Sequence, residues 1–330
     1  MTVTTIPTAG IADNSITTAK TAFNDIPFRN RIINGDISVS QRGTSFSNVA
    51  SGDYTIDRWK MNYRAIGNAD ISQVDNKTYK SLKVLNSNGS TQEIVMGTRI
   101  EDIAQFHNDS FILSFYAKAS TSCTLDTRVF ENYGAGGSTT VNRVVAGSQN
   151  KTITTSRQRF TITFTASDMS SKTIGTSNFL EINFSVSLAS GANWEYDSVQ
   201  LEQGTSASDF EFIPFDVNLQ RCQRYLQRYG NTNRQGICVG TLQPQSNLHC
   251  SMTYVNTMRA SPSQSFSNLQ MTDRYSADYT VSSIGNFIAA TDCCYVRFTT
   301  STNAPNENRV CYNIVVTGGS DGFFELDAEL

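Results

Sequence analysis

Asp53 and Asp57 lie four residues apart beside Arg58 and form a candidate pair of catalytic carboxylates. Two carboxyl groups can act together in glycoside hydrolysis, but such residues also form salt bridges or cap turns. The two histidines, His107 and His249, are far apart and have no partner at metal-ligand spacing. No nucleophile elbow, P-loop or H-E-x-x-H motif occurs. The sequence therefore offers few catalytic groups, and we expect a protein that is not an enzyme.

Tyrosines in loops are the residues best suited to binding a sugar. Sugar recognition uses an aromatic face that stacks on C–H groups, together with polar side chains for the hydroxyls. Tyr133 lies in the segment NYGAGG, and Tyr275 and Tyr279 flank an expected loop in the segment DRYSADY. We expect these rings to be exposed and to bind ligand. Trp59 and Trp194 lie in segments with the pattern of strands, and both are expected in the core.

The elements that position these residues are predicted to be short β-strands. Apolar and polar side chains alternate in residues 159–165 and 179–188, and residues 110–120 are apolar on both faces, as in a central strand. Segments rich in Gly, Asn and Ser separate these runs. The pattern predicts an all-β fold that begins with an antiparallel β-sandwich of the jelly-roll type. Further strands are expected in residues 237–242, 248–254, 294–300 and 310–316.

One helix is expected after the sandwich, with Asp216 as its N-cap and Gly230 as its end. It would carry an apolar stripe that either associates with other copies or, as its shortness favours, docks on its own domain. The stripe consists of Leu219, Cys222, Leu226 and Tyr229. The segment also holds a basic patch, which we expect to be a solvated face or to make salt bridges to a neighbouring subunit. The patch consists of Arg221, Arg224, Arg228 and Arg234.

Composition and charge argue against several classes of partner. The net charge of −3 produces no field that would attract nucleic acid or an acidic membrane. No apolar run approaches the ~20 residues of a membrane-spanning helix, and the first residues lack the pattern of a signal peptide. The seven cysteines are odd in number and include no C-x-x-C pair, which favours free thiols. We therefore expect folding in the cytoplasm of the producing cell.

Two blocks of sequence carry a resemblance to a known family. The first reads FRNRIINGDISVSQRGTSF from residue 28 and continues to YTIDRW at residues 54–59. The second reads VQLEQGTSASDFEFIPFDVNLQRCQRYLQRYG over residues 199–230. The N-terminal segment GIADNSITTAKTA, the phrase MRASP from residue 258 and the ending DAEL add to them. Together these motifs resemble those of bacteriophage tail-fibre and virion-fibre proteins.

The resemblance implies a fibre subunit in which the segment around Asp53 and Asp57 is structural. Such fibres are commonly homotrimers, assembled in the host cytoplasm and located in the virion. Residues 1–27 would be a short extended arm that attaches the fibre to another phage structural protein. The remaining units would be a jelly-roll domain (28–215), a connecting helix (216–230) and a smaller C-terminal β domain (231–330).

INGD at residues 33–36 and WEYDSVQL at residues 194–201 also resemble parts of jelly-roll carbohydrate-binding modules. Such modules often hold one structural calcium, and by position the matching residues here are Asp36 and Asp197. Asp197 could equally cap a turn or pair with an arginine. No cofactor is expected to be required.

The resulting prediction is adhesion to a host cell-surface glycan or receptor by a phage virion fibre, without catalysis. The alternative is a structural decoration fibre on the capsid or tail. A glycan-depolymerising tail spike is the third possibility. Neither nucleic acid nor a membrane is expected as a partner.

Overall fold

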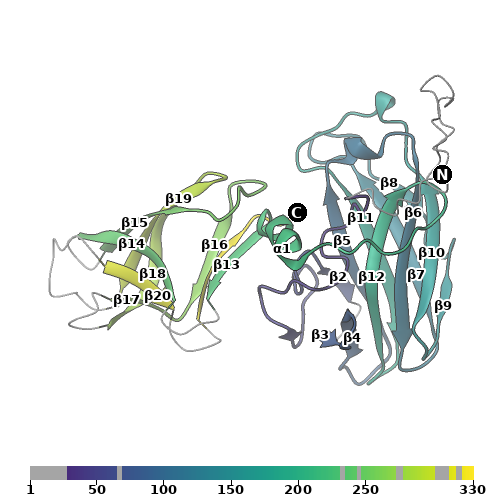
Figure 1. Ribbon diagram of the computed structural model, residues 1–330, viewed down its shortest axis with the longest axis horizontal. Coiled ribbons are helices and arrows are strands. Elements are labelled where there is room, and N and C mark those ends of the chain that lie inside the picture. Colours follow the sequence, from purple (N-terminus) through teal and green to yellow (C-terminus); the bar gives the residue numbers. More distant parts are fainter. Residues whose placement is uncertain are drawn as a thin grey trace, which may run out of the picture.

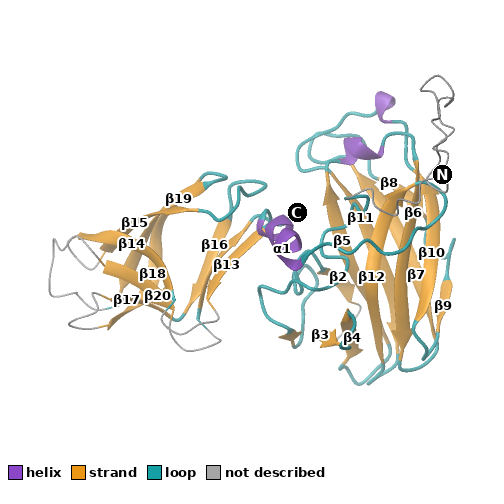
Figure 2. Ribbon diagram, viewed as in Figure 1, coloured by secondary structure: helices purple, strands orange, loops and turns teal. Residues whose placement is uncertain are grey.

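A computed structural model describes residues 28–64, 69–230, 235–243, 247–272, 278–301, 312–316 and 322–330. Two groups of β-strands stand apart, and one α-helix lies between them (Figures 1 and 2). The strands pair in antiparallel fashion in both groups. The all-β prediction is therefore confirmed, while the expected arm, residues 1–27, lies outside the described residues.

The first domain is a sandwich of two sheets. One sheet has the order β1-β3-β4-β12-β6-β10, formed by Ser45–Phe46, Ala69–Asp75, Lys80–Asn86, Asn193–Gln203, Ser110–Ala119 and Gln158–Thr165. The second has the order β2-β5-β11-β7-β8 with β9 beside β7, formed by Lys60–Arg64, Gln92–Glu101, Phe179–Leu188, Cys123–Asn132, Val141–Val144 and Lys151–Ile153. Its loops contain the short 3₁₀ helices η2 (Ile103–Phe106) and η3 (Met169–Ser171).

The core between the sheets follows the alternation of the strands. Every second residue of β11 faces inward and is at most 1% exposed, namely Leu180, Ile182, Phe184, Val186 and Leu188. Trp59 and Trp194 are fully buried, and their rings lie 4.9 and 4.8 Å from the ring of Tyr196. The predicted placement of both tryptophans in the core is confirmed.

The helix α1 spans Phe215–Gln223, so the expected helix over 216–230 is too long. It starts after Pro214, with Asp216 in the first turn, where the helix dipole favours a carboxylate. Leu226–Gly230 instead form strand β13, which pairs with β21. Only the first half of the predicted apolar stripe is helical, because strand pairing in the second domain overrides the local helical preference.

The second domain is smaller and has its own core. A three-stranded sheet, β13-β21-β16, consists of Leu226–Gly230, Phe323–Asp327 and Ser263–Ser267. A closed barrel, β14-β15-β19-β18-β17-β20, consists of Gly236–Gln243, Asn247–Thr253, Cys293–Thr300, Asp278–Ala289, Leu269–Thr272 and Tyr312–Val316. All four strands expected in this region are present. Six cysteines lie within the described residues of the chain, and all six are free thiols.

The motifs that resemble those of fibre proteins meet where the two domains join. Asn34 of INGD donates from Nδ2 to the carbonyl oxygen of Asp57 at 2.8 Å and accepts from Trp59 Nε1 at its own carbonyl oxygen at 3.1 Å. Asn218 of α1 donates to Asp36 Oδ1 at 2.8 Å. The two sequence blocks thus hold one another in place.

The end of the described chain, close to α1 in Figure 1, completes this junction. Arg42 Nη2 lies 2.8 Å from Asp327 Oδ2, and Arg58 forms an ion pair with Glu329. Arg259 of the MRASP phrase donates from Nε to the carbonyl oxygen of Ala328 at 2.9 Å. The motifs QRG, DRW, MRASP and DAEL therefore build the joint between the domains.

Candidate functional site

Tyr133 is fully buried, so the prediction that its ring is exposed is wrong. Its hydroxyl donates to Glu131 Oε2 at 2.8 Å, and Glu131 is itself fully buried. The inward alternation of β7, which includes Leu125 and Val129, continues through residues 131 and 133. Tyr133 therefore extends the inward face of β7, and the glycine-rich turn follows it.

Tyr279 is also buried rather than exposed, with 8% of its surface accessible. It lies on β18 opposite Met271 of β17 and packs into the core of the second domain. Tyr275 lies outside the described residues. Neither of the two described tyrosines thus lies at a surface site, and ligand binding by Tyr275 stays a prediction.

Asp53 and Asp57 do not form an exposed catalytic pair. Asp57 is fully buried, and its carboxylate accepts hydrogen bonds from the backbone and side chain of Gln41 at 2.7 and 2.5 Å. Burial raises its pKa, against the opposing effect of these hydrogen bonds. Asp53 is exposed and accepts from the backbone nitrogen of Ala50 at 2.9 Å. These contacts support the structural interpretation of the two residues.

Asp36 and Asp197 are each engaged by the protein. Arg157 contacts both oxygens of Asp197, with Nη2–Oδ1 and Nε–Oδ2 distances of 2.5 and 2.9 Å. Asp36 Oδ1 accepts from Asn218 and from the backbone of Ser38. Within the described ranges, no three His, Cys, Asp or Glu side chains gather as a metal site would require. The residues present favour an Arg157–Asp197 ion pair over a calcium ligand, and calcium stays a prediction.

The predicted basic patch is divided among different roles. Arg224 pairs with Glu101 of the first domain at 2.7 Å, and Arg228 pairs with Glu325 of the second domain at 2.8 Å. Both pairs join elements of this same chain. Arg221 is partly buried beside the end of α1, and Arg234 lies outside the described residues.

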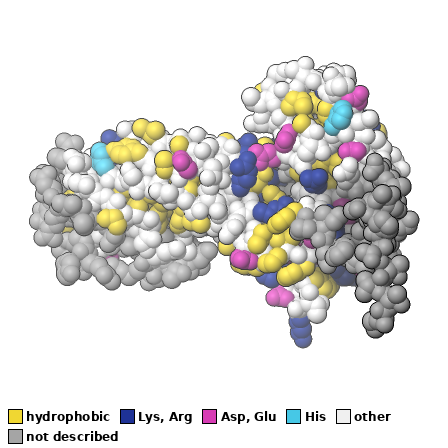
Figure 3. All heavy atoms as spheres, turned by 45° about the horizontal axis from the view of Figure 1, so that its top comes forward, with side chains coloured by type: hydrophobic (Ala, Val, Ile, Leu, Met, Phe, Trp, Pro, Cys, Tyr) yellow, Lys and Arg dark blue, Asp and Glu magenta, His cyan; other side chains and the backbone are white. Residues whose placement is uncertain are grey.

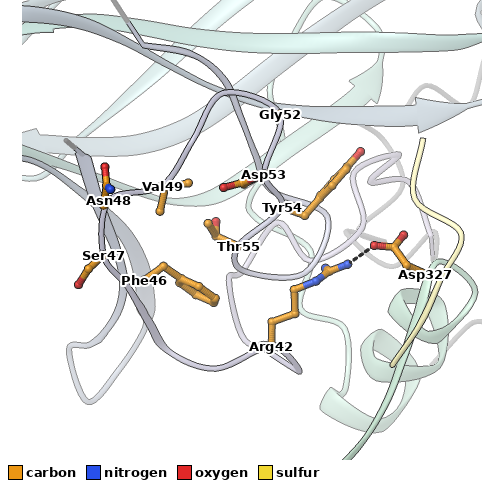
Figure 4. Close-up of a pocket in the computed structure, with 10 residues that line it drawn as sticks. All are labelled: Arg42, Phe46, Ser47, Asn48, Val49, Gly52, Asp53, Tyr54, Thr55 and Asp327. Carbon is orange, nitrogen blue, oxygen red and sulfur yellow. Dashed lines mark hydrogen bonds and ion pairs between the residues drawn. The ribbon is translucent and has the colours of Figure 1, made fainter. Parts of the chain in front are cut away.

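A pocket of about 480 Å³ lies at the domain junction (Figure 4). Arg42 and Asp327 face one another on its wall, with the rings of Phe46 and Tyr54 nearby. The Tyr54 hydroxyl donates to the carbonyl oxygen of Leu330 at 2.8 Å. Because its charged groups are bound to one another across the junction, we interpret this pocket as part of the joint.

The outer face of the second sheet offers a different kind of hollow, of about 540 Å³. It extends across β2, β5, β11, β7 and the turn before β8. Its lining is Asn62, Tyr63, Glu93, Val95, Arg99, Arg128, Phe130, Asn132, Thr140, Phe179, Glu181 and Asn183. We call this hollow the sheet cleft.

Strand register places the polar side chains of the sheet cleft side by side. Glu181 of β11 stands opposite Arg99 of β5 on one side and Phe130 of β7 on the other. Two residues further along β11, Asn183 stands opposite Gly97 and Arg128. Since inward positions of β11 fill the core, these alternate positions must face outward.

A hydrogen-bonded row crosses one half of the sheet cleft. Arg99 Nε lies 2.6 Å from Glu181 Oε2, Glu181 Oε1 accepts from Asn183 Nδ2 at 2.9 Å, and Asn183 Oδ1 accepts from Asn62. Gly97 makes room for the two amides, because a Cβ there would lie 2.3 Å from both of them. The row holds carboxylate, amide and guanidinium groups at a largely fixed spacing.

A second polar group occupies the other half. Arg128 contacts Glu93 and Asp126 at 3.2 and 2.8 Å, and Ser185 Oγ donates to Glu93 at 2.5 Å. The sheet cleft therefore presents both donors and acceptors, as a ligand rich in hydroxyl groups requires.

Aromatic rings complete the sheet cleft. Tyr63 is 49% exposed, and Phe130 is half-buried. The guanidinium carbon of Arg99 lies 4.3 Å from the ring centroid of Phe179. A bulge between Met61 and Tyr63, where β2 pairs with β5, shifts the alternation of β2. Sequence reasoning missed this site; the polar alternation of Glu181, Asn183 and Ser185 was the signal that could have revealed a functional outer face.

The comparisons with known proteins give no family. No family model matches the chain, and no curated protein matches it. Among solved structures, the chain is similar to the N-terminal cellulose-binding domain of Cellulomonas fimi beta-1,4-glucanase C, with 20% identity over 51% of this chain and 100% of that chain and a TM-score of 0.32.

Two further solved structures are similar at the same level. A family 11 carbohydrate-binding module from Clostridium thermocellum, in complex with a mixed-linked tetrasaccharide, has 16% identity over 50% of this chain and 99% of that chain, with a TM-score of 0.31. The CBM22-1 xylan-binding domain from Paenibacillus barcinonensis Xyn10C has 14% identity over 49% and 95%, with a TM-score of 0.30. Similarity at this level assigns neither a family nor a ligand.

Within the described part of the chain, no helix has the length and apolar character needed to cross a membrane.

Proposed function

We propose that this protein is a non-catalytic glycan-binding subunit of a bacteriophage virion fibre, and that the glycan binds in the sheet cleft. The observation that carries the glycan-binding part is the row of charged and amide side chains beside the exposed ring of Tyr63. A ring for stacking next to fixed donors and acceptors is the arrangement that sugars require.

The fibre part of the proposal is supported by the sequence motifs. The blocks at residues 28–59 and 199–230 resemble those of phage fibres, and the hydrogen bond from Asn218 to Asp36 joins the two blocks. Residues 1–27 would attach the fibre to the particle. A host cell-surface glycan or receptor is the proposed partner.

A glycan array with purified, labelled protein tests the proposed activity. We expect retention on a subset of bacterial surface oligosaccharides, with no release of reducing ends from the bound glycans. The absence of an exposed carboxylate pair at Asp53 and Asp57 supports binding without hydrolysis. Failure to bind any glycan or host cells would favour the decoration-fibre alternative, and release of reducing ends would favour a depolymerase.

We also propose that the subunit is a homotrimer, and light scattering can test this assembly. Phe212 and Phe215 are 79% and 55% exposed beside the start of α1, which supports burial of these rings against a second copy. The scattering mass is expected to be three times that of one chain. The double variant Phe212→Ser/Phe215→Ser is expected to lower this mass, since the two rings would lose their apolar contact. A monomeric wild-type protein at micromolar concentration would contradict the proposal.

A further inference from the structure

A second hollow, of about 560 Å³, lies where the end of β5 meets helix α1 and the beginning of the first domain. We call it the arginine groove. Basic side chains gather near the junction of the domains on the face shown in Figure 3. The charged residues that line the groove are Arg31, Arg99, Arg221, Arg224, Glu101 and Asp102.

Two of the four arginines are already neutralised by carboxylates. Arg224 Nη2 lies 2.7 Å from Glu101 Oε1, and the Tyr225 hydroxyl donates to the same carboxylate at 2.8 Å. Arg99 is paired with Glu181 at 2.6 Å. These pairs contribute little free positive charge to the groove.

Arg31 and Arg221 differ from Arg99 and Arg224 because they have no carboxylate partner among the described residues. Among the described residues, neither forms an ion pair, and Arg31 Nε and Arg221 Nη1 are buried without a hydrogen-bond acceptor. Arg221 Nη2 reaches the carbonyl oxygen of Asn30 at 3.5 Å, which is long for a hydrogen bond. Burial lowers the pKa of Arg221 despite the charge of Glu211. Both side chains line the groove, and a partly buried guanidinium there is stabilised when an anion approaches it.

The groove also provides an aromatic surface and a route to the sheet cleft. Phe28 is 57% exposed, and the guanidinium carbon of Arg221 lies 5.9 Å from its ring centroid. Arg99 lines both hollows. Strand β5 runs from Glu93 in the sheet cleft to Glu101 in the groove, so the two hollows adjoin along one strand.

We propose that the arginine groove is an anionic subsite of the glycan site, which makes an acidic glycan the preferred ligand. A carboxylate or phosphate on one sugar would contact Arg31 and Arg221, its ring would lie on Phe28, and neighbouring sugars would continue past Arg99. The guanidinium fork matches the geometry of either anion. This inference rests on the proposed glycan-binding function.

Matched oligosaccharides can separate glycan binding in the sheet cleft from anion binding in the arginine groove. The probes are oligosaccharides bearing uronic acids or phosphorylated sugars, each compared with its carboxyl-reduced or dephosphorylated counterpart on one array. The wild-type protein is expected to bind the acidic member about tenfold or more tightly, as the loss of a charge-assisted hydrogen bond implies. The carboxylated and phosphorylated pairs then show which anion the groove prefers.

Variants locate the preference in the groove. Arg221→Gln and Arg31→Gln are each expected to reduce the preference toward unity while binding of the neutral member remains. Arg221→Lys, which keeps the charge but loses the fork, is expected to restore part of it. Lys77→Gln removes the same charge from the exposed β3–β4 turn and is expected to change nothing. Melting temperatures of all variants verify folding.

The array results distinguish a failure of the anionic subsite from a failure of glycan binding. If wild-type protein binds acidic and neutral members equally and Arg221→Gln alters neither, the anionic subsite is overturned while glycan binding stands. A groove that binds an acidic peptide instead of a glycan would also give equal binding of the acidic and neutral members. If the wild-type protein binds neither member of any pair, the proposed function itself fails and the subsite fails with it.

Discussion

Replacing Glu329 with alanine is expected to lower the free energy of unfolding by about 3 to 5 kcal/mol, since it leaves a buried charge without its partner. Arg58 is 1% exposed and forms an ion pair with Glu329, whose side chain is 4% exposed. Burial alone would lower the pKa of Arg58, but the combined charges of Glu329, Tyr225 and Tyr54 raise it, so the guanidinium stays charged. Urea unfolding followed by tryptophan fluorescence measures the loss.

An exposed ion pair provides the control for this variant. Glu93 pairs with Arg128 at 3.2 Å, and the side chains of the two residues are 39% and 29% exposed. Screening by water limits such a pair to about 1 kcal/mol or less, so Glu93→Ala should unfold near the wild-type midpoint. Equal effects of Glu329→Ala and Glu93→Ala would contradict the role assigned to the junction pair.

Replacing Trp59 with alanine is expected to cost about 3 to 5 kcal/mol of stability, because it leaves a large cavity in the core. The side chain is fully buried, packs against Tyr196 at 4.9 Å, and donates from Nε1 to Asn34 at 3.1 Å. The variant therefore loses both packing and the tie to the INGD loop. Calorimetry should show a lower melting temperature for the first domain.

Tyr63 is the matched control, since it lies on the adjoining strand β2 and its side chain is half exposed. Surface substitutions usually change stability by about 0.5 kcal/mol or less, so Tyr63→Ala should melt close to the wild-type protein. A Trp59→Ala protein as stable as Tyr63→Ala would contradict the placement of Trp59 in the core.

Alternation along the chain was enough to predict the sandwich and much of its core. The period of two in residues 179–188 correctly predicts the inward face of β11, and the tryptophans follow from their strand-like surroundings. The sequence predicts too long a helix because residues 226–230 pair with β21, which is distant in sequence. Local patterns carry no information about that pairing.

The candidate site was much less predictable than the fold. The sheet cleft combines side chains from four strands, and their neighbourhood depends on the strand order β2-β5-β11-β7, which alternation cannot supply. The glycines after Tyr133 predict a loop tip there, yet the residue occupies an inward position that continues β7. Tyr63 owes its exposed position to a bulge, and a bulge shifts the alternation on which the prediction relies.

Isothermal titration of the tightest-binding array glycan into wild-type protein, Tyr63→Ala and Val255→Ala tests the central claim most directly. Val255 is a 63% exposed residue of the second domain and serves as the control. Loss of one stacking ring is expected to weaken binding by about tenfold, equivalent to roughly 1.4 kcal/mol, without lowering the melting temperature. Val255→Ala should bind like the wild-type protein. Unchanged affinity in Tyr63→Ala would contradict binding in the sheet cleft.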